Sequence, residues 1–157
     1  MVVSASSRKS LEPGLLRIKS QEGSDVLVGS QCQKCQRRYF PFRKWCAACS
    51  EPTCETIELS HEGTLASFTL VARKSAHSLI EPPYVLGEVL LPVGIRIYTT
   101  INLQSDVSSK GVKVHSTIGH DNLDSLKIGG EVRLSPIVVK RDEEGHDIVA
   151  YNFEIVR

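Results

Sequence analysis

The sequence has 157 residues, of which 41% are hydrophobic and 24% charged, and this suits one ordinary domain with a small appendage. The formal net charge is only +1 and aromatic residues make up 6% of the chain. No global excess of charge therefore indicates nucleic acid, a membrane surface or an acidic substrate. No apolar run approaches the ~20 residues that a membrane-spanning helix needs.

The first predicted elements lie before the cysteine-rich part of the chain. Residues 1–13 are polar and rich in serine, which predicts a flexible tail, and they lack the apolar stretch of a secretory signal. Two short extended runs follow, LLRIK (15–19) and DVLVG (25–29), and the turn-like QEGS separates them. We therefore expect a cytoplasmic protein, with a β-hairpin that leads into the first cysteine pair.

All five cysteines lie between residues 32 and 54, in the pattern Cys32-x2-Cys35, ten residues, Cys46-x2-Cys49. Two residues between cysteines let one tight turn aim both thiolates at one point, and two such turns complete a tetrahedron of sulfurs. The spacing predicts a structural Zn²⁺ held by Cys32, Cys35, Cys46 and Cys49. A closed four-sulfur site leaves no position for a catalytic water.

Other states of these thiols stay open. Two disulfides or four free thiols are possible, but reducing surroundings favour metal binding by clustered cysteines. Iron accepts the same four ligands as zinc. Such turns usually place glycine just after the second cysteine, where a positive φ is needed, and here Gln36 and Ser50 stand there. Cys54 has no place in the pattern and is expected to be a buried or partly exposed thiol.

The rest of the chain, after a boundary at Glu51-Pro52, reads as strands. Asp121 is expected to cap a short helical turn that ends before Gly129-Gly130. The last two runs flank the turn DEEG and predict a final hairpin. The extended runs are at residues 63–73, 84–91, 94–103, 111–118, 131–140 and 147–156.

Roughly five strands with a short helical segment before the last two favour a small closed barrel of the OB type, with a sandwich as the competing layout. Glycines in the strands permit the bends that closure of a barrel needs. We therefore expect a mainly β protein in three parts: a tail at 1–13, a hairpin and zinc ribbon at 14–54, and an OB-fold barrel at 55–157.

Several segments, in this order, resemble the acyl-CoA-associated OB-fold proteins (domain of unknown function 35) that carry an N-terminal rubredoxin-like zinc ribbon. The resemblance covers nearly everything from residue 27 onward. Two departures are an apparent hairpin where many relatives have a helical pair, and an extra stretch at 102–117. The matching runs are LVGSQCQKCQRRYFPFRKWCAACS (27–50), EGTLASFTLV (62–71), PPYVLGEVLL (82–91), LKIGGEVRL (126–134) and YNFEIV (151–156).

The resemblance implies a small subunit that is not an enzyme by itself and that pairs with a thiolase-like catalytic subunit acting on CoA thioesters. It also implies that ribbon and barrel dock on the partner and help to shape the channel that holds CoA. Within the family, the layout is most similar to zinc-finger subunits of thiolases from anaerobic aromatic degradation. Accessory subunits of acyl-CoA hydratases or aldolases are the alternative that the same resemblance leaves open.

A basic and aromatic segment lies between Cys32 and Cys49. It contains five basic residues and no acidic ones, interleaved with four aromatic residues. Cations suit the phosphates of CoA, so Arg37, Arg38, Arg43 and Lys44 are candidate contacts to CoA or acyl-CoA. A simpler interpretation has the cations offset the negative charge of a four-thiolate site and the aromatic residues form a miniature core. The aromatic residues could equally be anchors of a protein interface.

The sequence offers no convincing set of catalytic groups and argues against nucleic-acid binding. A thiolase needs a cysteine nucleophile with acid and base groups, but the five histidines are scattered and none is spaced with Cys54 in a defensible set. Zinc ribbons and OB barrels also bind single-stranded nucleic acids through basic and aromatic patches. The near-neutral chain argues against that alternative, and aromatic residues of the barrel such as Phe68, Tyr84, Tyr98, Tyr151 and Phe153 read as core. A free-standing acyl-CoA or lipid-binding protein ranks third.

Overall fold

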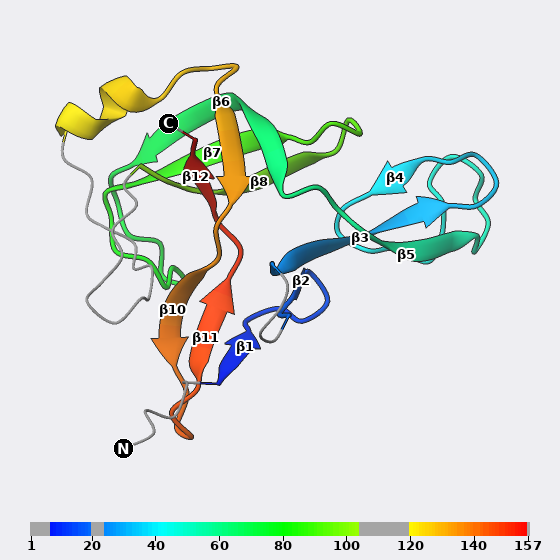
Figure 1. Cartoon of the computed structure of the whole chain (residues 1–157), viewed down its shortest axis with the longest axis horizontal. Coiled ribbons are helices and arrows are strands. Elements are labelled where there is room, and N and C mark those ends of the chain that lie inside the picture. Colours follow the sequence, from blue (N-terminus) through cyan, green and yellow to red (C-terminus); the bar gives the residue numbers. More distant parts are fainter. Residues whose placement is uncertain (1–6, 20–23, 104–119, 157) are drawn as a thin grey trace.

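The computed structural model describes residues 7–19, 24–103 and 120–156, and almost all of its regular structure is β-strand. A barrel, a small sheet beside it and a projecting ribbon make up the molecule (Figure 1). The strands are β1 (Arg8–Ser10), β2 (Leu16–Arg17), β3 (Val26–Cys32), β4 (Arg38–Tyr39), β5 (Cys54–Glu58), β6 (Glu62–Val71), β7 (Tyr84–Leu90), β8 (Arg96–Asn102), β9 (Glu131–Leu134), β10 (Ile137–Arg141), β11 (Asp147–Ala150) and β12 (Phe153–Ile155).

Five strands close into a barrel in the order β12-β8-β7-β6-β9. Strands β6, β7 and β8 form an antiparallel meander, and β12 closes the barrel by pairing parallel with β8 and antiparallel with β9. A register shift between Leu65 and Ser67 bends β6, as closure of a small barrel requires. The predicted five-stranded OB-type barrel is confirmed.

The two last predicted strands each divide between the barrel and a second sheet. The run 131–140 becomes β9 in the barrel and β10 outside it, and the run 147–156 becomes β11 outside and β12 inside. The predicted hairpin around DEEG is the antiparallel pair β10–β11. Asn152 is fully buried between β11 and β12, and Ser135 lies between β9 and β10, so both stand where the chain passes from one sheet to the other. The Asn152 amide donates to the Ser135 carbonyl, and its side-chain oxygen accepts from the Thr100 hydroxyl at 2.6 Å.

Residues 7–13, the described part of the segment expected to be a flexible tail at 1–13, do not form a free tail. Residues Arg8–Ser10 form β1, which pairs parallel with β11 and completes the small sheet β1-β11-β10. Arg8 also forms an ion pair with the buried Asp25 at 2.5 Å, and Lys9 pairs with Asp142 at 3.1 Å. A polar, serine-rich composition does not reveal such partners, which lie far away in the sequence.

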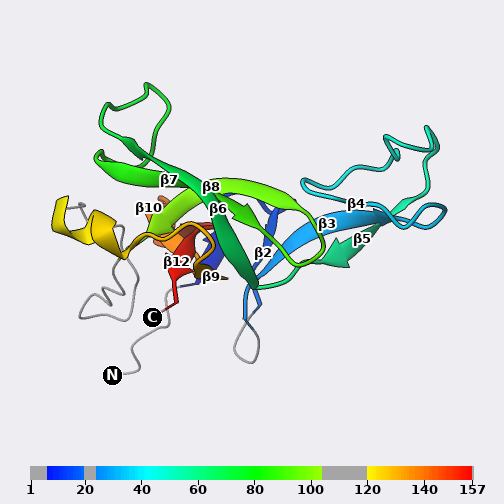
Figure 2. The same ribbon diagram turned by 90° about the horizontal axis from the view of Figure 1, so that it is seen from above.

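The ribbon sheet consists of β2, β3, β4 and β5, with β3 at its centre. The predicted hairpin is confirmed, because β2 and β3 pair antiparallel with Leu16 opposite Leu27. Strand β5 pairs with β3 from Val28↔Glu58 to Cys32↔Cys54, so the ribbon sheet continues past the expected boundary at residue 54. Seen from above, β3, β4 and β5 extend away from the barrel (Figure 2).

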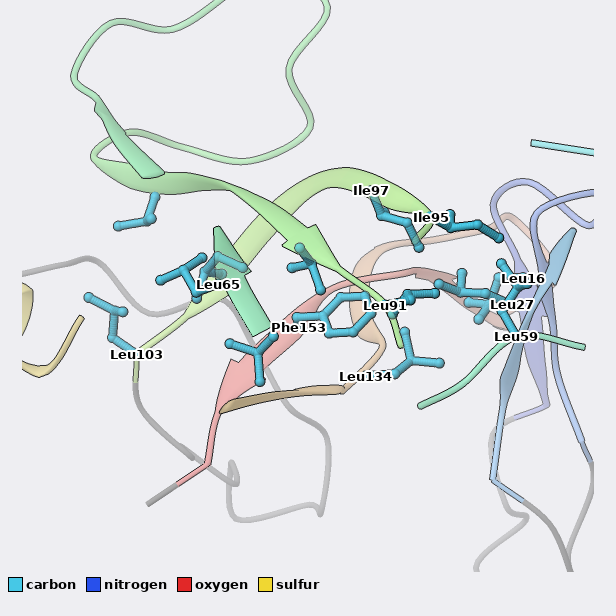
Figure 3. Packing of buried hydrophobic residues seen from close by; sticks show 14 of the residues in the cluster. Leu16, Leu27, Leu59, Leu65, Leu91, Ile95, Ile97, Leu103, Leu134 and Phe153 are labelled. Atoms are coloured by element: carbon cyan, nitrogen blue, oxygen red, sulfur yellow. The ribbon is translucent and has the colours of Figure 1, made fainter. Parts of the chain in front are cut away.

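One hydrophobic core joins the barrel to the base of the ribbon. Phe153 lies at its centre with no exposed surface, and Leu65 and Leu103 fill the barrel on one side of it (Figure 3). On the other side, Leu27 and Leu59 bring the ribbon sheet into the same cluster (Figure 3). The base of the ribbon is therefore fixed to the barrel by apolar burial.

The remaining predictions concern the segment between β8 and β9. A 3₁₀ helix, η1 (His120–Ser125), stands where a short helical turn was expected. The predicted strand 111–118, and most of the extra stretch at 102–117, lie outside the described residues. Within the described ranges, no helix has both the length and the apolar character that crossing a bilayer demands.

Candidate metal centre

The first cysteine turn follows directly from the end of β3. Strand β3 is held on both sides, by β4 and by β5, and it is buried along most of its length. Cys32, its last residue, is fully buried and lies opposite Cys54 of β5. The position of the first sulfur is therefore fixed by a strand that is anchored in the core.

Both Cys-x2-Cys turns have the same pattern of hydrogen bonds. In the first, the Gln36 N–H donates to the Cys32 carbonyl at 2.9 Å and the Cys35 N–H lies 3.5 Å from the Cys32 Sγ. In the second, the Ser50 N–H donates to the Cys46 carbonyl at 2.8 Å and the Cys49 N–H lies 3.4 Å from the Cys46 Sγ. The two turns are thus equivalent and present their sulfurs in the same way.

The residue after each turn has a left-handed backbone. Gln36 has φ of 63° and Ser50 has φ of 55°, and they are the two non-glycine residues with positive φ in the part of the chain that the structure describes. The spacing of the cysteines predicts a positive φ at these two positions, where glycine would be the less strained residue. The local geometry of a metal-binding turn is kept here in spite of the side chains.

The four sulfurs lie close enough together to hold one ion. The Sγ atoms of Cys32, Cys35, Cys46 and Cys49 are all within 4.8 Å of one another, and those of Cys35 and Cys46 are 3.6 Å apart. A tetrahedral site with Zn–S bonds of about 2.3 Å places its sulfurs about 3.8 Å apart. All five cysteines are free thiols rather than disulfides. The set fits zinc in size, number and chemistry.

Two hydroxyl groups outside the cysteine set reach the sulfurs. The Tyr39 hydroxyl is 3.2 Å from the Cys46 Sγ, and its hydrogen bond lowers the pKa of Cys46 to about 6. The Thr53 hydroxyl, 3.0 Å from the Cys32 Sγ, lowers the pKa of that thiol. Sequence reasoning missed both contacts, because Tyr39 reads only as one more aromatic residue and Thr53 carries no motif.

The fourth thiol shows why a cation is needed. The pKa of Cys49 is raised to about 12, because its thiol forms a hydrogen bond with Cys35 and because burial disfavours the charged thiolate. Several thiolates cannot share one small space unless a positive charge balances them. A divalent ion supplies that charge and ionises the coordinating thiols outright. The cluster is therefore suited to a metal and poorly suited to four ionised free thiols.

Cys54 lies beside this centre but outside the ligand set. It is 7% exposed and packs with Cys32 and Cys46. Burial raises the pKa of its thiol, which is the opposite of what an activated nucleophile needs. Of the two states expected for Cys54, a buried or a partly exposed thiol, the structure shows the buried one.

The four basic candidates for CoA contact are exposed on the ribbon. Arg37, Arg38, Arg43 and Lys44 all lie at the surface. The Arg43 guanidinium stacks over the Tyr39 ring, 4.6 Å from its centroid. Lys34, the fifth cation, instead forms an ion pair with Glu51 at 2.6 Å and so links the two cysteine turns.

The aromatic residues of the ribbon divide into two groups. Tyr39 and Phe40 are half-buried, and Phe40 packs edge-on against Tyr151 at the barrel, at 5.8 Å and 89°. Phe42 and Trp45 are 44% and 60% exposed, so the interpretation of the ribbon aromatics as a miniature core is wrong for both. Their backbone is fixed on both sides, because the Arg43 N–H donates to the Ser30 hydroxyl and the Cys54 N–H donates to the Lys44 carbonyl.

The barrel aromatics also differ from expectation in part. Phe153 is core and Tyr151 packs against it, but Phe68 is 38% and Tyr98 is 66% exposed. The prediction that these two are core residues is wrong. Phe68 lies on the part of β6 that is mostly exposed, and Tyr98 is on the outward face of β8, where its hydroxyl donates to Glu88.

Comparison with curated proteins gives consistent matches. Benzoylsuccinyl-CoA thiolase subunit BbsA of Thauera aromatica is 25% identical over 141 residues, which cover 90% of this chain and 84% of that protein. The BbsA of Geobacter metallireducens is 26% identical over 116 residues, covering 71% and 77%. A DUF35 domain-containing scaffold protein of Methanocaldococcus jannaschii is 33% identical over 72 residues, covering 45% and 51%.

Among solved structures, that of the Ltp2-ChsH2(DUF35) aldolase superimposes with a TM-score of 0.58 at 23% identity, over 83% of this chain and 84% of that one. This likeness supports the fold. The family model described as ChsH2, C-terminal OB-fold domain, matches residues 56–135, which is more than half of the sequence. The barrel topology, the paired cysteine turns and these matches agree, and the chain belongs to the ChsH2 C-terminal OB-fold (DUF35) family.

Proposed function

We propose that this protein is a non-catalytic, zinc-containing accessory subunit of an acyl-CoA thiolase-type complex. It docks on a thiolase-like catalytic subunit and helps to form the site for CoA or acyl-CoA. The observation that carries the proposal is the match to the thiolase subunit BbsA over 90% of the chain. A match of that length has to include most of the ribbon sheet as well as the barrel.

The ribbon has the chemistry for both parts of this role. Phe42 and Trp45 offer exposed apolar area on a fixed backbone, which suits an anchor in a protein interface. Arg37, Arg38, Arg43 and Lys44 offer cations to the phosphates of CoA at the edge of that interface. The partner supplies the nucleophile and the acid–base groups, and Cys54 is too buried to reach a substrate.

Two alternatives remain within reach of the same observations. An aldolase or hydratase subunit could be the partner in place of a thiolase, and the fold likeness to the Ltp2-ChsH2(DUF35) aldolase favours that variant. Single-stranded nucleic acid is the alternative of a different class. The exposed Phe68 and Tyr98 favour it, since bases stack on such rings, but the net charge of +1 does not.

Affinity purification of the tagged chain from its native host, followed by mass spectrometry, tests the proposal. We expect a thiolase-like catalytic subunit in amounts comparable to the bait. Recovery of an aldolase or hydratase subunit in place of the thiolase would support the first alternative, in which that enzyme is the partner. Recovery of nucleic acid or ribosomal proteins in its place would contradict the accessory role.

Charge reversal tests the CoA contacts directly. Arg37→Glu with Arg38→Glu should raise the apparent KM of the complex for CoA about ten-fold or more, because charge-assisted bonds to phosphate are each worth roughly 1.5–3 kcal/mol. The matched control is Lys127→Glu with Lys140→Glu, which changes the net charge equally at two exposed positions outside the ribbon. An equal KM for both double variants would exclude these arginines from the cofactor site.

A further inference from the structure

A cavity of about 220 Å³ lies between the outer wall of the barrel and the small sheet β1-β11-β10. Its walls come from β1 and the residues after it, from the loop before β7, and from strands β2, β7, β8, β10 and β11. Among the described residues that line it, none belongs to the metal centre or to the basic segment of the ribbon. The cavity is therefore separate from the metal centre and from the proposed CoA contacts.

The floor of the cavity is apolar and preformed. Leu16, Ile137 and Val149 line it, and each is 1% exposed because the other side of each residue packs into the protein. Leu86, exposed on β7, and Ile80, half-buried in the preceding loop, form apolar parts of the rim. Rigid apolar walls of this kind favour a ligand with an apolar body.

Most polar groups of the lining already have partners. The Thr100 hydroxyl donates to the Asn152 side chain at 2.6 Å, and the Thr99 hydroxyl donates to the Tyr151 carbonyl at 3.4 Å. Ser10 is different, because its Oγ is buried and has no hydrogen-bond partner among the described residues. Ser10 lies opposite Val149 in the β1–β11 pair, so the two side chains share the face of the sheet that borders the cavity.

The charge around the cavity selects against anions. Glu12 is the single charged residue among the described residues of the lining. Tyr151, which shares the cavity, has a pKa that burial and the Glu12 carboxylate raise, so its phenol stays protonated. A carboxylate or phosphate ligand would be repelled by Glu12 and would find no cation in this lining.

We propose that this cavity binds a neutral, largely apolar small molecule about the size of one substituted aromatic ring. A hydroxyl or carbonyl group of this molecule would form a hydrogen bond with the Ser10 hydroxyl. Size supports the ring, because an apolar cavity of about 150 Å³ is known to accept benzene. The larger volume here leaves space for a short polar substituent. This inference does not rest on the accessory role, since it uses a different surface and a different ligand.

Titration of the zinc-loaded full-length chain with benzyl alcohol, followed by amide NMR shifts, tests the site. Saturable shifts should occur at Ser10, Leu86 and Val149 and at their neighbours around the cavity. Benzoate, equal in ring size but anionic, should bind at least ten-fold more weakly. The absence of saturable shifts around the cavity, or equal binding of benzoate, would overturn the proposal.

Two variants separate the roles of hydroxyl and cavity. Ser10→Ala should weaken benzyl alcohol about five-fold, as expected for one lost hydrogen bond, and should change toluene binding by less than two-fold. Leu86→Trp, at an exposed rim position, should weaken both probes. The control is Ser67→Ala on β6, whose hydroxyl bonds Glu88 outside the cavity and should matter to neither probe. Equal effects of Ser10→Ala and Ser67→Ala would contradict the assignment of the hydroxyl.

Discussion

Tyr39 is the side chain that links the metal centre to the surface of the ribbon. Its hydroxyl bonds the Cys46 sulfur at 3.2 Å, and its ring carries the Arg43 guanidinium. Groups that bond a metal ligand from outside orient the ligand and tune its charge, and losing one commonly lowers metal affinity by about 10–100-fold. The contact therefore belongs to the candidate metal centre, although Tyr39 lies outside the set of four cysteines.

We expect Tyr39→Phe to lower zinc affinity about ten-fold, measured by competition with a chromogenic chelator. The lost hydrogen bond also raises the pKa of Cys46 above its present value of about 6. Because protons compete with the metal for the thiolate, zinc release on acidification should then begin at a higher pH. Tyr98→Phe, which removes a hydroxyl bonded to Glu88 on the barrel, is the control. Equal zinc affinity in both variants would rule out the role of Tyr39.

Ser50 allows a direct test of backbone strain in the second cysteine turn. With φ at 55°, it has a conformation that glycine adopts without steric penalty. Ser50→Gly should raise the free energy of unfolding of the zinc-loaded chain by about 0.5–1 kcal/mol, measured by denaturant titration. Ala47→Gly in the same turn, where φ is not positive, should lower it by a similar amount. Destabilisation by both changes would show that the turn is not strained.

At the scale of elements, barrel closure depends on close packing beneath β7. A Cβ on Gly87 would lie 2.5 Å from the Ile101 Cγ1 and 3.0 Å from the Leu65 Cδ1. Gly87→Ala should therefore lower the free energy of unfolding by about 1–3 kcal/mol while zinc content stays at one per chain. Gly14→Ala, with open space around it, should change stability by less than about 0.5 kcal/mol. Similar stability of both variants would contradict the packing described here.

The sequence predicted which segments are extended better than which sheet each one joins. Alternation in residues 94–103 correctly placed Ile97 and Ile101 inside the barrel. The run 131–140 gave no sign that it changes sheets after Leu134, because periodicity reports exposure and not the partner strand. The passage of the chain from one sheet to the other is accompanied by hydrogen bonds of Asn152 with Ser135 and Thr100, which are far from it in the sequence.

The same limit applies to the metal centre. The spacing of the cysteines and the need for positive φ at Gln36 and Ser50 are local properties, so they could be predicted from the sequence. The hydroxyls of Tyr39 and Thr53 reach the sulfurs through tertiary structure, and a single sequence contains no signal for that. The sequence likewise does not decide whether Phe42 and Trp45 are buried or exposed, because their exposure depends on how the ribbon folds.

At the scale of the whole molecule, the ribbon that carries the exposed Phe42 and Trp45 extends away from the barrel (Figure 2). If this ribbon docks on a catalytic subunit, Phe42→Ser with Trp45→Ser should weaken that complex at least about ten-fold in a calorimetric titration, as for truncated interface anchors. The melting temperature of the free chain should change little. Ile128→Ser, at a 70% exposed position before β9, is the control. Equal affinities for the ribbon and control variants would place the interface elsewhere.

Native mass spectrometry of the complex purified from the source organism tests the central claim most directly, because one spectrum reports both metal and partner. The account predicts an assembly in which each copy of this chain carries one zinc ion and is bound to a thiolase-like catalytic subunit. A metal-free chain, or a zinc-bearing chain found alone or with nucleic acid, would contradict it.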